Sequence, residues 1–166
     1  MRWRRLWQHL AASRRSVRRA FPDSTLKAIE DAVRTGELLH DGEIRFAVEA
    51  DLDWRELLRS TTSRQRAIEV FSLLRMWDTE RNNGLLIYLL FADRDVEIVA
   101  DRGFSERVAD AAWQEICDAM RARFAAGEFE TGALHGIAAA SRLMAAHFPA
   151  DPGRGRDELP DRPVLL

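Results

Sequence analysis

The sequence predicts an α/β domain built on a small mixed β-sheet that is flanked by helices on both faces. Two strand patterns lead to this view: "EIRFAVEA" (43–50) alternates apolar and polar residues, and "LLIYLLFA" (85–92) is a continuous apolar run. The first pattern is typical of a half-covered strand and the second of a central strand buried on both faces. A third pattern, "VEIVAD" (96–101), follows a short polar turn at 93–95.

The order of these segments predicts the sheet topology. A helical pattern separates the first two strands, so we expect them to be parallel and joined by a crossover. The turn at 93–95 is too short for anything but a hairpin, so the third strand should run antiparallel to the second.

A basic amphipathic helix is predicted at residues 1–20. This segment is rich in arginine and has no acidic residue, and its tryptophans and leucines fall on one side at helical spacing. Such a helix either packs on its own domain or docks on an anionic membrane or a partner. The candidate docking residues are Trp3, Arg4, Arg5, Trp7, Arg14 and Arg18.

Further helices follow at points where capping residues precede apolar periodicity. Asp23 or Ser24 starts the first, and the pair Thr62 and Gln65 matches a capping box that opens the second. Apolar residues at Ile68, Val70, Phe71, Leu74 and Trp77 form the expected buried face of that second helix.

Two more helices close the main domain, which we place at residues 21–149. Ser105 is expected to cap a long helix that Gly127 ends, and Thr131 starts the last one. Residues 150–166 are rich in proline, glycine and charge, and should form an extended or disordered C-terminal tail.

Composition limits the possible functions. The 166 residues, 46% of them hydrophobic, suffice for one compact domain, and the net charge of −2 gives no indication of nucleic-acid binding. The single cysteine excludes an intramolecular disulfide or a cysteine-built zinc site. Since no stretch approaches about 20 apolar residues, we expect a soluble protein of the cytoplasm.

The predicted topology gathers polar residues at both ends of the sheet, and either end has oxygen ligands suited to a hard cation. One end joins the starts of the first two strands to the end of the third, and its candidate metal ligands are Asn82, Asn83, Asp101, Asp78 and Glu43. The opposite end, where the parallel strands finish, offers Asp93, Asp95, Asp51 and Asp53. Ligands of open α/β sheets usually bind at the end where the parallel strands finish. Both ends have suitable ligands, so the residues alone do not decide between them.

The stretches "RNNGLLIYL" (81–89) and "ADRDVEIVADRGF" (92–104) resemble the core motifs of the TPM domain family. "HDGEIRFAV" (40–48) is similar to the family's opening strand, and "FAAGEFETGALHGIAAASRLMAAHFP" (124–149) to its closing segment. On this resemblance, Asn82, Asn83 and Gly84 take the positions of the family's [DN]-N-G motif. Asn82 stands where many members have aspartate. Asp101 and Ser105 stand at the first glycine and the glutamate of a Gly-x-Gly-[LF]-Glu segment.

The resemblance implies a Rossmann-like fold and, as in several members, a bound divalent cation, usually calcium. We expect a weak site here, because the Asn82 departure removes a charged ligand. The short bacterial members resemble soluble companions of membrane-anchored TPM proteins and LemA-type proteins. The expectation is therefore a non-catalytic module that binds calcium and docks to a membrane-associated partner at the inner face of the membrane. The alternative is a metal-dependent acid phosphatase, an activity attributed to the family's plant branch.

Overall fold

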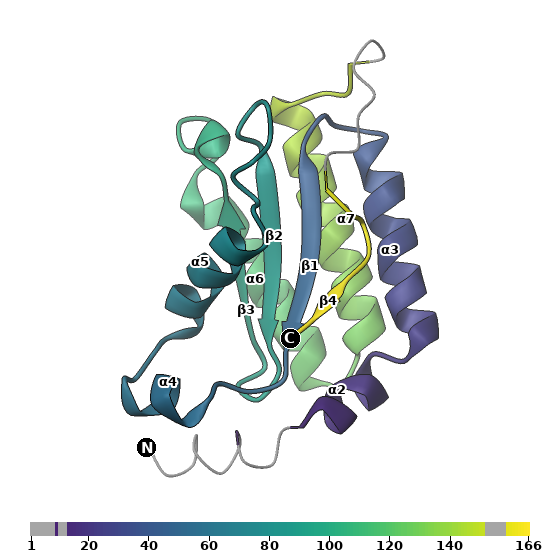
Figure 1. The fold of residues 1–166 in the computed structure, drawn as a ribbon. Coiled ribbons are helices and arrows are strands. Elements are labelled where there is room, and N and C mark those ends of the chain that lie inside the picture. Colours follow the sequence, from purple (N-terminus) through teal and green to yellow (C-terminus); the bar gives the residue numbers. More distant parts are fainter. Residues whose placement is uncertain (1–8, 10–12, 152–158) are drawn as a thin grey trace.

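The sheet has four strands in the order β3-β2-β1-β4 (Figure 1). The computed structural model describes residue 9, residues 13–151 and residues 159–166. The strands are β1 (Glu43–Glu49), β2 (Gly84–Leu90), β3 (Asp95–Ala100) and β4 (Val164–Leu165). β1 pairs in parallel with β2, and β2 pairs antiparallel with β3. The predicted α/β class, the parallel crossover and the hairpin are therefore confirmed.

The C-terminal segment adds a strand that the sequence analysis did not anticipate. β4 pairs in parallel with β1. Two contacts fix the segment that leads to β4. Glu43 accepts a hydrogen bond from the N–H of Leu159 at 3.2 Å, and the buried Asp161 pairs with Arg34 at 3.1 Å. The segment thus lines the edge of β1 that would otherwise stay open.

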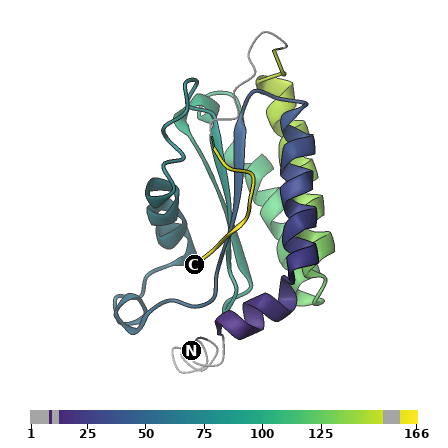
Figure 2. The same ribbon diagram turned by 45° about the vertical axis from the view of Figure 1, so that its right-hand side comes forward.

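Helices cover both faces of the sheet unequally (Figure 2). One face packs against α2 (Arg14–Ala20), α3 (Asp23–Glu37), α6 (Asp110–Ala125) and α7 (Phe129–His147). The other face packs against α5 (Ser63–Leu73), which covers mainly β2 and β3. Two short elements, α4 (Trp54–Leu58) and a 3₁₀ turn at Arg102–Phe104, complete the described structure.

Some helix boundaries differ from the sequence expectation. The Thr62–Gln65 capping box is present. Ser105, however, does not cap α6, which begins at Asp110 because the chain first makes the 3₁₀ turn that buries Phe104. Ile68 and Trp77 were expected inside but are 47% and 51% exposed. No helix among the described residues is long and apolar enough to cross a membrane.

The open edge of β3 is covered by arginine side chains. Arg64 of α5 donates to the carbonyl of Ile98, and Arg121 of α6 donates to the carbonyl of Val96, both at 2.5 Å. Charged side chains on an edge strand oppose pairing with another chain. The two arginines and the C-terminal strand therefore protect opposite edges of the sheet.

Gly84, the first residue of β2, has no room for a side chain. A Cβ placed there would lie 2.0 Å from the backbone oxygen of Met76. We expect Gly84→Ala to lower the free energy of unfolding by more than about 2 kcal/mol, because the backbone must move. Gly127→Ala is the control: its site is open, so only its positive φ of 83° is penalised, by roughly 1 kcal/mol. Urea unfolding of both variants measures the difference, and equal losses would contradict this account of Gly84.

Candidate functional site

The edge at which β1 and β2 begin holds a buried asparagine with an unused acceptor. Asn83 is 1% exposed, and its side-chain amide donates to the carbonyl of Asp41 at 2.8 Å. Its backbone N–H donates to the hydroxyl of Thr79. The remaining oxygen, Oδ1, is buried and has no hydrogen-bond partner. A buried acceptor of this kind is costly unless something binds it.

Asp101 supplies a second unused oxygen at the same edge. Its backbone N–H donates to the carbonyl of Gly84 at 2.9 Å, which places Asp101 opposite Gly84, the residue that follows Asn83. Its Oδ1 accepts from the N–H of Arg102, whereas its Oδ2 is buried without a partner. Asp101 also lines a cavity of about 400 Å³, together with Ser105, Trp113 and other residues of β3 and α6.

The two loops that carry the family motifs contact each other directly. Asn82 has a positive φ of 54°, and its carbonyl accepts from the N–H of Gly103 at 2.8 Å. Its side-chain oxygen accepts from Nε of Arg102 at 2.8 Å. Arg81 pairs with Asp41 at 2.7 Å. Hydrogen bonds therefore join the loop before β2 to the turn after β3.

The other predicted ligands of this edge are placed less favourably. Asp78 is exposed in the loop before β2. Glu43 is 5% exposed and already accepts a hydrogen bond from Leu159. Among the described residues, no group of three or more histidine, cysteine, aspartate or glutamate side chains is arranged to hold a metal ion. A cation bound at this edge would therefore need amide and carbonyl oxygens as ligands, in addition to the carboxylate of Asp101.

At the opposite edge, protein groups already engage three of the four predicted carboxylates, those of Asp93, Asp95 and Asp53. Asp93 pairs with the buried His9 at 3.2 Å, and Asp95 pairs with Arg121 at 2.7 Å. Asp53 caps α4 through two backbone N–H groups, and the hydrogen bond from Glu56 lowers the pKa of its carboxyl. Burial raises the pKa of the Asp51 carboxyl, which disfavours its charged form.

Sequence reasoning missed a buried polar network on the α5 face. The hydroxyl of Tyr88 donates to Glu49 at 2.5 Å, and Arg66 of α5 binds the same carboxylate through Nε and Nη2. Burial raises the pKa of the Tyr88 phenol far above its usual range, and the charge of Glu49 adds to the rise. Tyr88 falls inside an apolar run, so only its hydroxyl indicated that a polar partner was needed.

The predicted docking residues are described only in part. Trp3, Arg4, Arg5 and Trp7 lie outside the described residues. Arg14 and Arg18 are on α2 and exposed. The same helix buries Val17 in the main core.

These observations define a class: an α/β module whose candidate site is made by loops at one end of a mixed sheet. The sequence model of the TPM domain family matches residues 17–143, and the chain belongs to this family. Among solved structures, the chain is similar to the BA42 protein of the psychrophilic bacterium Bizionia argentinensis, solved by NMR. The two share 32% identity with a TM-score of 0.75, over 86% of this chain and 93% of that one. No curated protein matches.

The Tyr88–Glu49 contact predicts an unusual alkaline titration. Because the phenol's pKa is higher in the folded than in the unfolded chain, protonated Tyr88 stabilises the fold, and this contribution declines as the pH rises above about 10. The chain has a single tyrosine, so tyrosinate absorbance reports Tyr88 alone. We expect that absorbance to appear only together with loss of the circular dichroism signal. In guanidinium it should titrate near about pH 10. Tyrosinate formation in the intact fold would contradict the burial argument.

Proposed function

We propose that this protein is a non-catalytic TPM module that binds a divalent cation of the calcium type and docks to a membrane-associated partner at the inner face of the membrane. The observation that supports the cation is the pair of buried, unpartnered oxygens, Asn83 Oδ1 and Asp101 Oδ2. Calcium favours carboxylate, amide and carbonyl oxygens of this kind. Because Asp101 is the one charged member of the pair, the affinity should be low.

The alternative function, a metal-dependent acid phosphatase, needs cationic groups that can meet the charge developing on a phosphoryl group. Two arginines lie in the loops of this edge, Arg81 and Arg102. Each already has a partner, Asp41 for the first and the side-chain oxygen of Asn82 for the second. We therefore favour cation binding without catalysis.

Docking is supported by the arginines of α2. Arg14, Arg15, Arg18 and Arg19 are exposed on this helix, and none of them has a carboxylate within salt-bridge distance in the described part of the chain. Val17 and Phe21 anchor the helix in the core, being 3% and 1% exposed. The helix is therefore a fixed part of the domain that presents its cations outward.

A calcium titration followed by amide NMR shifts tests the cation site. We expect shifts centred on Asn83 and Asp101. In Asp101→Asn we expect about tenfold weaker binding or more, the order set by the loss of one charged contact. Asp95→Asn, at the opposite edge, is the matched control and should bind as the wild type does. Shifts centred on Asp93 and Asp95, or no shifts at all, would refute the site.

Docking is tested by sedimentation with bacterial inner-membrane vesicles. We expect Arg15→Gln/Arg18→Gln to bind roughly 30-fold more weakly, the order expected for two cations near an anionic surface. Arg142→Gln/Arg162→Gln removes the same charge from exposed positions elsewhere and should bind normally. Truncation of residues 1–20 is unsuitable, because it would also remove the buried His9 and Val17. Equal binding by both double variants would refute docking through α2.

A further inference from the structure

The short helix α4 presents two large apolar side chains to solvent. Trp54 is 64% exposed and Leu58 is 70% exposed. They are four residues apart, so they lie on one face of the helix. No residue of α4 is buried, and the helix is held at its start by the capping box of Asp53 and Glu56. The helix thus projects an apolar ridge that the rest of the domain does not cover.

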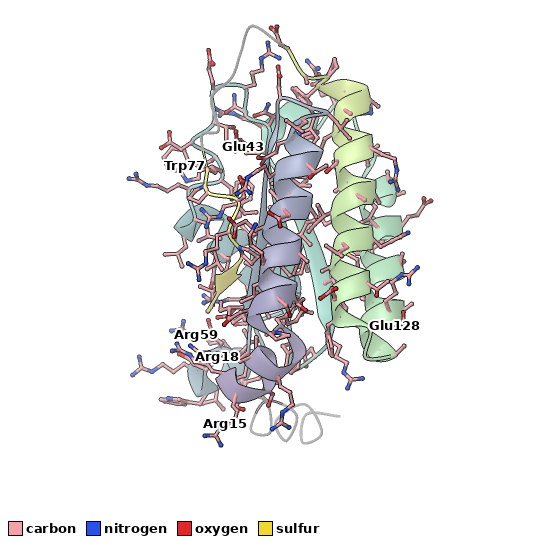
Figure 3. The ribbon with its side chains drawn as sticks, turned by 90° about the vertical axis from the view of Figure 1, so that its right-hand side faces the viewer. Arg15, Arg18, Glu43, Arg59, Trp77 and Glu128 are labelled. Atoms are coloured by element: carbon pink, nitrogen blue, oxygen red, sulfur yellow. The ribbon has the colours of Figure 1, made fainter. Side chains whose placement is uncertain are left out.

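Arginines lie next to this ridge and elsewhere at the same end of the molecule. Arg55 lies over the Trp54 ring, its guanidinium carbon 5.4 Å from the ring centroid, and Arg59 follows the end of α4. Figures 1 and 2 both place α4 and α2 at the same end of the molecule, where the parallel strands finish. Figure 3 shows Arg15, Arg18 and Arg59 at this end and Glu43 at the other. The exposed arginines of two helices therefore lie at the end that carries the ridge.

Four acidic residues at this end of the molecule already have partners within the protein. Asp53 binds backbone N–H groups of α4, Glu56 pairs with Arg66 at 3.2 Å, and Asp93 pairs with His9. Glu128, also at this end in Figure 3, pairs with Arg123 at 3.3 Å. In the described part of the chain, Arg55 and Arg59 have no carboxylate within salt-bridge distance. Among these described residues, the exposed arginines of this end therefore outnumber the carboxylates that are left without a partner.

We propose that this end binds directly to an anionic lipid surface, with Trp54 and Leu58 inserted at the headgroup boundary and the arginines of α2 and α4 on lipid phosphates. The proposal rests on the docking function above and names its partner. Tryptophan is suited to that boundary because its ring is apolar and its N–H is polar. Arginine binds phosphate through paired N–H groups. A protein partner would be expected to bury a wider apolar patch than two side chains provide.

Sedimentation with pure lipid vesicles tests the proposal, using phosphatidylcholine alone or with roughly one-third phosphatidylglycerol. We expect the wild type to bind the anionic vesicles and to be released by salt. Trp54→Ala/Leu58→Ala should bind about tenfold more weakly or worse, with an unchanged melting temperature, since neither residue is buried. Leu38→Ala/Leu39→Ala removes an exposed apolar pair, 75% and 53% exposed, from the opposite end and should bind as the wild type does.

Quenching by brominated lipids locates the contact. We expect Trp54→Phe to bind but to lose much of the quenching, although four other tryptophans remain. Unchanged binding of Trp54→Ala/Leu58→Ala, or unchanged quenching of Trp54→Phe, would overturn the insertion of α4. If the wild type binds native membranes but not pure anionic vesicles, docking stands and direct lipid contact is wrong. If it binds neither, both proposals are wrong.

Discussion

The structure depends on the burial of β2 on both faces. All seven residues from Gly84 to Leu90 are buried, so the strand needs an apolar layer on each side. Leu85, Ile87 and Leu89 point into the larger core with α3, α6 and α7. Leu86, Tyr88 and Leu90 point toward α5. The crossover that leaves β1 contains α5 and therefore covers one face. The helices before and after the sheet cover the other.

The α5 side has one long helix, and polar interactions complete it. Arg66 extends from α5 to Glu49 on β1, and Tyr88 of β2 binds the same carboxylate, so one buried charge connects three elements. Arg64 extends from the same helix to the edge of β3. A buried ion pair adds little net stability, because the cost of desolvating its charges offsets their attraction. We infer that Glu49 sets the position of α5 over the sheet.

Local patterns predicted the strands and the Thr62 capping box, because each of these follows from residues close together in sequence. The order of the strands, with the crossover rule and the short turn at 93–95, predicted their pairing. The features that were missed depend on distant partners. Glu49 and Tyr88 are 39 residues apart, and β4 follows a proline-rich segment that carries no strand periodicity. Trp77 was predicted to be buried because the helical spacing continues to it, whereas α5 ends at Leu73. At the candidate site, the predicted topology placed Asn83 and Asp101 at one end of the sheet, and the family resemblance favoured that end. Only the packing shows which of their oxygens lack partners.

The candidate cation edge and the arginine-rich end lie at opposite ends of the sheet. Seven-residue strands separate them, a distance of roughly 23 Å at about 3.3 Å per residue. Ligands of α/β sheets commonly bind where parallel strands finish, yet here Asp93, Asp95 and Asp53 of that end are engaged by His9, Arg121 and the start of α4. A module that rests on a membrane by this end would leave the Asn83–Asp101 edge facing the aqueous side. Cation binding and surface docking would then proceed without competing for the same residues.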